Sequence, residues 1–290
     1  MFTEHLSNGI ALGSIYALTA IGFTMVYGII RLINFAHGDI YMMGAFITLT
    51  ALTLFNLPII IAFLIGMIGA ALVGVAIAKF AYSPVFKAPK INLFLSAVGV
   101  AIFLENFAML IWGPQTQSFP TVINNKVYNI AGLRVNTIQI LILGITIVMV
   151  AILTYIVQYT KLGRAMRCVS QDIDVSRLMG INTNRIIYFT FVLGSMLGAA
   201  AGTLVGMYYK AVYPMMGFVP GLKAFISAVI GGIGSIPGAM LGGLIMGVAE
   251  SLGAAYISSG YRDAIAFIIL IVILLIKPEG ILGKHVSEKI

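Results

Sequence analysis

The chain has 290 residues, of which 60% are hydrophobic and only 9% are charged, and its mean hydropathy is +1.06. Soluble domains carry roughly 25% charged residues, so this composition excludes both a water-soluble globular protein and a disordered chain. The formal net charge of +8 is attributed to the cytoplasmic loops of a membrane protein and requires no nucleic-acid partner. The single cysteine, Cys168, excludes an intrachain disulfide.

Long apolar runs predict an all-α membrane protein with about eight transmembrane helices, folded as one domain over residues 1–290. A helix that crosses a bilayer needs about 20 apolar residues. The run over 222–257 is too long for one crossing, and glycines and Pro237 interrupt it, so we divide it into 222–233 and 238–257. The other expected segments are 9–30, 39–56, 58–78, 91–112, 137–158, 186–209 and 263–277. The first nine residues lack a basic cluster, so we expect a retained first span and no cleaved signal peptide.

Basic residues set the expected orientation, because cytoplasmic loops collect Lys and Arg. The polar stretch 159–185 is strongly basic and is placed in the cytoplasm, with 31–38 and 79–90 on the same side. The N-terminus and the segment 113–136 then lie outside, where 113–136 is expected to form a small lid or hairpin. The C-terminal tail lies inside if the break within 222–257 allows that segment to cross twice.

A few polar residues stand in or beside the apolar runs. Asn34, His37 and Asp39 form a polar patch at the mouth of a span, where a polar turn or broken helix is favoured over a metal or proton site. The chain has only 3 His, and they are scattered. Glu105 and Glu250 fall inside apolar runs, where a charge is costly, so we expect both to face the protein interior. There they either line a pathway or form buried hydrogen bonds.

Glycine recurs at every fourth residue in two of the expected helices, which predicts faces on which another helix packs closely. These glycines are Gly194, Gly198, Gly202 and Gly206 in one helix, and the pairs Gly238/Gly242 and Gly243/Gly247 in the other. The triplet Leu-Gly-Ser occurs at 12–14 and at 193–195, in spans expected to run in opposite directions. An inverted repeat would give this arrangement, although chance explains so short a match at least as well.

Within the cytoplasmic segment 159–185 we expect a short amphipathic helix over about 171–181, lying parallel to the membrane. Ser170 would cap it, acidic residues would occupy its first turn, and Gly180 would end it. Such a helix either docks on a protein or rests on lipid, and its acidic start favours a protein because the membrane surface is anionic. The residues expected at this contact are Asp172, Asp174, Arg177, Leu178, Met179 and Gly180.

The chain contains no G-x-x-x-x-G-K-[ST], G-x-S-x-G, H-E-x-x-H or C-x-x-C sequence. We therefore expect no nucleotide site, no catalytic residues, no metal site and no cofactor in this chain. Two other classes stay open at this point. A channel would not need a docking helix, and a membrane-embedded enzyme would need a converging cluster, such as His37, Asp39 and Glu105 in direct contact.

Motifs along nearly the whole chain resemble those of permeases of branched-chain amino-acid ABC importers, of the LivH type. The sequence NFAHGDIYMMGAF at 34–46 is similar to a stretch of that family, as are KLGRAMR at 161–167 and SRLMGIN at 176–182. The glycine-rich VIGGIGSIPGAMLGGLIMGVAE at 229–250 and the ending PEGILG at 278–283 also match. Each motif alone is weak, whereas all of them in the expected order are specific.

This resemblance implies a multi-pass permease of the bacterial inner membrane that works by alternating access. The family pairs it with a second permease subunit, two ATP-binding subunits that hold ATP and Mg, and an extracytoplasmic solute-binding protein. The implied substrate is a branched-chain amino acid; relatives that carry urea, short amides or other amino acids are the alternative. The residues we assign to the substrate path are Asn34, His37, Asp39, Glu105, Gly231, Gly232 and Glu250.

Overall fold

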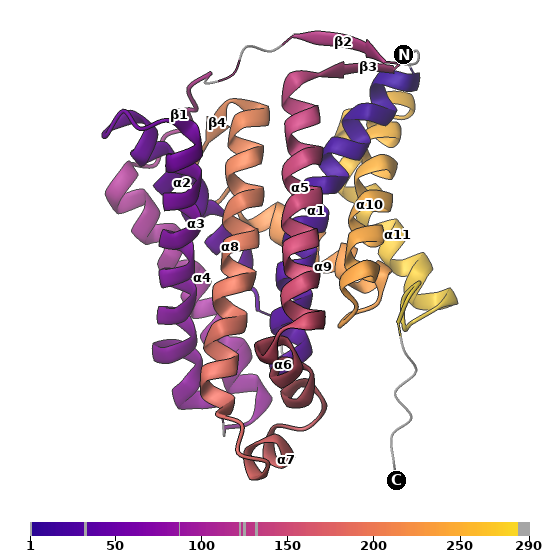
Figure 1. The fold of residues 1–290 in the computed structure, drawn as a ribbon. Helices are drawn as coiled ribbons and strands as arrows, with labels where there is room; N and C mark the ends of the chain where they lie inside the picture. The colour runs from indigo at the N-terminus through magenta and orange to yellow at the C-terminus, as the bar shows by residue number, and fades with distance from the viewer. Residues whose placement is uncertain are drawn as a thin grey trace.

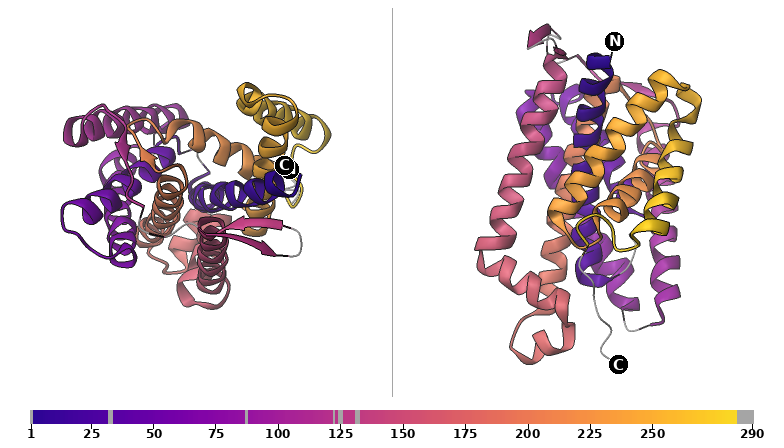
Figure 2. Two further views of the ribbon diagram at one scale, coloured as in Figure 1. Left: turned by 90° about the horizontal axis from the view of Figure 1, so that it is seen from above. Right: turned by 90° about the vertical axis from the view of Figure 1, so that its right-hand side faces the viewer.

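The computed structural model describes residues 2–31, 34–86, 88–121, 123, 126–130 and 133–283, and these form an elongated helical bundle (Figures 1 and 2). The helices are α1 Phe2–Ile30, α2 His37–Thr53, α3 Ile59–Ala76, α4 Lys90–Trp112, α5 Thr137–Tyr159, α6 Lys161–Gln171, α7 Ile173–Leu178, α8 Thr183–Tyr209, α9 Phe218–Gly231, α10 Ile236–Tyr256 and α11 Arg262–Ile276. A π-helical turn at Ile77–Tyr82 and a 3-10 turn at Ser83–Val85 extend α3, and a 3-10 turn at Ser259–Tyr261 precedes α11. The strands are β1 Gln117–Ser118, β2 Val127–Ile130, β3 Leu133–Asn136 and β4 Ala211–Val212.

Every expected apolar segment is a helix, so the all-α prediction is confirmed. Within the described residues, 7 helices are long and apolar enough to cross a membrane. The prediction of about eight spans also counted 39–56, which forms α2, a helix of 17 residues that begins inside the bundle. The predicted division of 222–257 is confirmed, because α9 ends at Gly231 and α10 starts at Ile236. Gly232 between them has a φ of +101°, which favours glycine.

Burial divides the helices into a central group and a peripheral group. α1, α2 and α8 are buried along most of their length, whereas α4, α5 and α11 bury only a narrow stripe. The exposed faces of the peripheral helices are apolar, as expected where lipid is the solvent. The site described below lies between the central helices α1 and α2, the short helix α9 and one peripheral helix, α4.

The glycine stripes lie where helices touch, which confirms their predicted packing role. A β-carbon on Gly247 of α10 would overlap the backbone of Gly13 on α1. A β-carbon on Gly202 of α8 would likewise overlap the carbonyl of Tyr41 on α2. These helices approach at backbone distance because side chains are absent from the contact.

The chain reverses direction twice inside the bundle, and each reversal ends in a helix that starts in the interior. α1 runs the length of the bundle and is followed by α2, which returns from the interior (Figure 1). α8 runs opposite to α1 and is followed by residues 210–217, which lead back inward to the start of α9. The two units have the opposed orientation that an inverted repeat would give.

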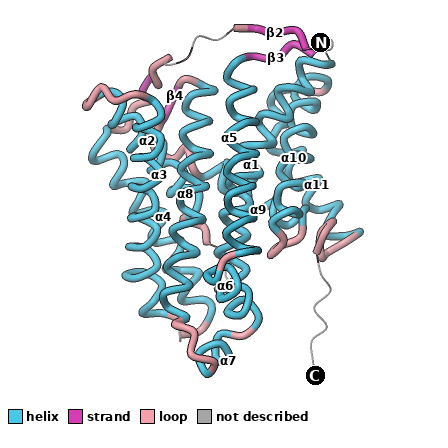
Figure 3. Tube along the Cα trace, viewed as in Figure 1, coloured by secondary structure: helices cyan, strands magenta, loops and turns pink. Residues whose placement is uncertain are grey.

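The two ends of the bundle carry the segments that the basic residues assign to opposite sides. The N-terminal end of α1 lies beside the β2–β3 hairpin, and α6 and α7 lie at the other end (Figure 3). Ser7 of α1 donates a hydrogen bond to the carbonyl of Arg134 in β3. The hairpin predicted within 113–136 is therefore confirmed. Near the C-terminus, Ile281 and Leu282 bond through their N–H groups to the carbonyls of Ile230 and Gly231 at the end of α9.

The segment 159–185 differs from its prediction. We expected one helix over 171–181 capped by Ser170, but the chain forms α6 and then α7, and Ser170 lies inside α6. The boundary is Asp172, whose Oδ1 accepts hydrogen bonds from the N–H groups of Asp174 and Val175 and so caps α7. Ser170 instead donates its hydroxyl to the carbonyl of Arg167, a bond within the preceding turn.

Candidate functional site

A cavity of about 140 Å³ lies where the starts of α2 and α9 meet α1 and α4. Its walls are mostly apolar, with three polar side chains among them, and it is partly open, since Ile102 and Phe218 in its lining are 55% and 59% exposed. The lining residues are Phe23, Asn34, Phe35, Gly38, Asp39, Val98, Ala101, Ile102, Glu105, Phe218, Gly221, Leu222 and Phe225. A mostly apolar cleft with a few converging polar groups is the usual form of a small-molecule site.

Beside the cavity, the first turn of α2 and the start of α9 are in direct backbone contact. A β-carbon on Gly38, in the first turn of α2, would overlap the carbonyl of Gly217, which immediately precedes α9. The reverse also holds, because a β-carbon on Gly217 would overlap the carbonyl of Gly38. Glycine at both positions lets the two N-termini meet, and helix N-termini present N–H groups and partial positive charge.

The structure brings three of the predicted path residues together at this cavity: Asn34, Asp39 and Glu105. Asn34 is buried, and its Oδ1 accepts a hydrogen bond of 2.5 Å from the hydroxyl of Tyr82. Within the described part of the chain, Asn34 Nδ2 and Asp39 Oδ1 are buried and have no hydrogen-bond partner. Buried polar atoms of this kind are rare, so they mark a place where a ligand or water completes the bonding.

His37 belongs to the same turn but does not line the cavity. Its ring packs edge-on against Phe23, with centroids 6.1 Å apart, and lies between Gly22 of α1 and Gly198 of α8. Among the residues that the structure describes, no three His, Cys, Asp or Glu side chains form a group that could hold a metal ion. The polar patch at 34–39 forms a turn followed by the first residues of α2, which begins at His37.

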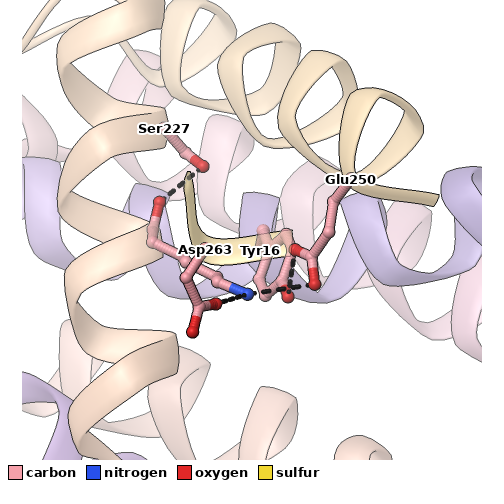
Figure 4. Close-up of polar contacts among 5 residues, drawn as sticks. Tyr16, Ser227, Glu250 and Asp263 are labelled. Atoms are coloured by element: carbon pink, nitrogen blue, oxygen red, sulfur yellow. Dashed lines mark hydrogen bonds and ion pairs between the residues drawn. The ribbon is translucent and has the colours of Figure 1, made fainter. Parts of the chain in front are cut away.

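Glu250 lies in a different place, a buried charge cluster between α1, α9, α10 and α11 (Figure 4). Its Oε1 is 3.0 Å from the Nζ of Lys223, and its Oε2 accepts a 2.8 Å hydrogen bond from the hydroxyl of Tyr16. The same Nζ is 2.8 Å from Asp263 Oδ1 at the start of α11. Ser227 donates to the backbone carbonyl of Lys223, one turn along α9.

Sequence reasoning missed Lys223, Tyr16 and Asp263 as members of this cluster. Lys223 carried a usable signal, since a lone lysine inside an apolar run needs a partner in the membrane. Gly231 and Gly232, the remaining predicted path residues, lie at the far end of α9 from the cavity. There a β-carbon on Gly232 would collide with the backbone of Gly283.

The predicted coupling residues lie at the end of the bundle opposite the N-terminus. Leu178 and Met179 are 87% and 78% exposed, although they are large and apolar. Asp174 and Arg177 form an exposed ion pair at 3.8 Å on the same short helix. Beside them is a cavity of about 700 Å³ whose lining includes Arg31 and Lys90, so three predicted cytoplasmic segments meet at one end.

Comparisons with known proteins place this geometry in a family. Residues 5–274 match the family described as branched-chain amino acid transport system / permease component. The chain is 43% identical to the high-affinity branched-chain amino acid transport system permease protein LivH of Salmonella typhimurium, over 100% of this chain and 98% of that protein. It is also 43% identical to the permease protein BraD of Pseudomonas aeruginosa, over 100% of this chain and 98% of that protein.

A solved structure shares the fold. A chain of PsaBC from Streptococcus pneumoniae in complex with Fab superposes with a TM-score of 0.53 at 12% identity, covering 95% of this chain and 92% of that one. The family match spans nearly the whole bundle, including the turn at 34–39, the helices α6 and α7 and the broken region before α10. The chain therefore belongs to the family of permease components of branched-chain amino acid transport systems.

Proposed function

We propose that this permease carries branched-chain amino acids across the bacterial inner membrane by alternating access, driven by ATP hydrolysis in separate subunits. The observation that carries the proposal is the interior cavity at the meeting of α2 and α9, which combines apolar walls with unpartnered polar atoms. Such discontinuous helices are a frequent way to build a substrate site in a transporter. The names of the LivH and BraD relatives supply the substrate class.

In this proposal the predicted path residues have two kinds of role. Asn34, Asp39 and Glu105 face the substrate in the cavity. The others hold the helices that form the walls: His37 packs the start of α2 against α1 and α8, Glu250 fixes α9 through Lys223, and Gly231 with Gly232 allow the tight turn into α10.

The partner subunits bind at opposite ends of the bundle. The ATP-binding subunit receives α6 and α7, because Leu178 and Met179 offer exposed apolar anchors beside the Asp174–Arg177 pair. Arg167 of α6 donates hydrogen bonds to the carbonyls of Val157 and Gln158 at the end of α5. A push on this segment is thereby transmitted to a transmembrane helix. The solute-binding protein docks at the end that carries the β2–β3 hairpin, and a second permease subunit completes the path.

Reconstitution in proteoliposomes tests the function. The chain is combined with its partner permease, two ATP-binding subunits and leucine-loaded binding protein, and accumulation of labelled leucine is measured. We expect accumulation that requires ATP and this chain. Leucine entry at the same rate without ATP would identify a facilitator, and ATP-driven entry of urea in place of leucine would contradict the substrate.

The coupling contact has its own test. Replacing Leu178 and Met179 with Asp should leave the bundle folded, since both side chains are exposed, but should prevent ligand-stimulated ATP hydrolysis. Leu178→Ile combined with Met179→Leu, which keeps both exposed side chains apolar, is the matched control and should retain stimulation. ATPase activity of the purified complex is measured with and without loaded binding protein. Unchanged stimulation in the double variant, with all subunits co-purifying, would remove α7 as the contact.

A further inference from the structure

We propose that the central cavity binds its amino acid as an oriented zwitterion, with the α-ammonium group toward Asp39 and Glu105 and the α-carboxylate toward Asn34 and the start of α2. This inference rests on the proposed transport function and assigns a polarity to its site. It also defines the substrate class by chemistry: a small molecule must carry an ammonium group and a carboxylate group on the same carbon atom, with a hydrocarbon tail.

The acidic side of the cavity needs a cation. Asp39 and Glu105 both line it, and none of the described lining residues is Lys or Arg. The nearest candidate on α9, Lys223, is already held by Glu250 at 3.0 Å and Asp263 at 2.8 Å, outside the cavity lining. Two carboxyl groups that share a poorly solvated space repel each other when both are ionised. An ammonium group between them removes that cost and supplies the donor that Asp39 Oδ1 lacks.

Other residues of the cavity lining offer donors. Asn34 Nδ2 is buried without a partner within the described residues, because only the Oδ1 of that amide is engaged, by Tyr82. Gly38 lines the same space in the first turn of α2. The N–H groups of His37, Asp39 and Ile40 bond to the carbonyls of Asn34 and Ala36, which leaves the N–H of Gly38 as the backbone donor in this described turn. The 14-residue helix α9 begins on the same cavity, so two N-terminal dipoles converge on it. A carboxylate satisfies both the amide and this positive potential.

The remaining lining fits a branched hydrocarbon chain. Phe23 and Phe225 meet edge to face with centroids 5.6 Å apart, and Val98, Ile102 and Leu222 complete the apolar wall. A polyhydroxylated or wholly polar ligand such as urea would lose hydration against these side chains without recovering hydrogen bonds. The cavity therefore distinguishes leucine-like zwitterions from the neutral substrates that the sequence left open.

The test measures binding to the permease–ATPase complex in lipid nanodiscs, without the solute-binding protein, so that selectivity comes from the permease alone. Isothermal titration compares leucine with two truncated analogues: 3-methylbutylamine, which lacks the carboxylate, and 4-methylpentanoate, which lacks the ammonium. We expect leucine to bind best, the amine to bind more weakly, and the acid to bind weakest because it faces two carboxyl groups unneutralised.

Single amide substitutions then localise the preference. Asp39→Asn and Glu105→Gln should each weaken leucine binding by at least about tenfold, the effect of losing a charge-assisted hydrogen bond. Both should also reduce the preference for the amine over the acid. Asn106→Ala is the matched control, because Asn106 is the next residue on α4, is exposed and bonds only its own helix at Ile102. Glu105 is only partly buried, so its amide variant provides a folded test even if the Asp39 variant does not assemble.

Equal binding of leucine and 4-methylpentanoate would overturn the oriented site, as would undetectable leucine binding or wild-type leucine affinity in both amide variants. These results leave the proposed function standing if the complete importer still accumulates leucine. Failure of the wild-type importer to accumulate any branched-chain amino acid would instead overturn the proposed function itself.

Discussion

Removal of the Lys223 ammonium should destabilise the permease far more than removal of the charge on Asp263, the more exposed of its two carboxylate partners. The Lys223 side chain is 7% exposed and that of Glu250 is 4% exposed, so Lys223→Met leaves a buried carboxylate without its cation. Breaking a buried ion pair from one side costs about 3–5 kcal/mol of unfolding free energy. Asp263 lies at a similar distance from the same nitrogen, but its side chain is 61% exposed. Asp263→Asn should therefore cost less than about 1 kcal/mol.

A double substitution separates the ion pair from general disruption of α9. In Lys223→Met combined with Glu250→Gln, the neutral amide keeps the hydrogen bond from Tyr16, and the carboxylate that loses its cation is that of Asp263, which is 61% exposed to solvent. We expect this pair to recover about 1–3 kcal/mol relative to the sum of the single changes. Equilibrium unfolding in mixed micelles titrated with SDS, followed by far-ultraviolet circular dichroism, measures each variant. Equal losses for Lys223→Met and Asp263→Asn, or strict additivity in the double variant, would refute the reasoning that burial, and not distance, sets the energy.

Two further predictions concern packing and orientation. Gly38→Val should prevent assembly, because its side chain would overlap the backbone carbonyl of the glycine that precedes α9. Gly144→Ala is the control and should be tolerated, because no atom lies within 4 Å of the added carbon. The yield of monodisperse protein is measured for both variants. In a Cys168→Ser background, an impermeant thiol reagent applied to intact cells should label a cysteine at position 126 and spare one at position 164. Labelling of position 164 would reverse the assigned orientation.

The sequence was a good guide to the fold because lipid imposes a simple rule on each segment. A run of about 20 apolar residues must satisfy its own backbone, so the helices could be placed one at a time. The family, the multi-pass inner-membrane location and the permease role, rather than an enzyme, are confirmed by the family match and the relatives. Glycine spacing also predicted close packing, since that consequence of a missing side chain is local.

Predictions that depend on partners far along the chain were weaker. The sequence placed Asn34 and Asp39 in one polar patch and Glu105 in a separate segment, and only the meeting of α2, α4 and α9 shows that the three share a cavity. Glu250 was read as a path residue because its cation, Lys223, lies 27 residues earlier and becomes visible only when α9 packs against α10. Its role in the path remains a proposal. The cap of α7 was misplaced by two residues, because Ser170 and Asp172 are both good caps and only the backbone geometry decides between them.

The contact between the starts of α2 and α9 also determines how a movement of either helix affects the cavity. At its C-terminal end α2 is tied to α4, because Trp112 donates a 2.7 Å hydrogen bond to Thr50 and stacks on Phe46. At its own C-terminal end α9 is tied to the segment after α11 through Ile281 and Leu282. The N-terminal ends of the two helices meet at Gly38 and Gly217, which are in direct backbone contact, so no side chain separates α2 from α9 there. Because Gly38 also lines the cavity, a change in the angle between the two helices would change the shape of the cavity wall directly.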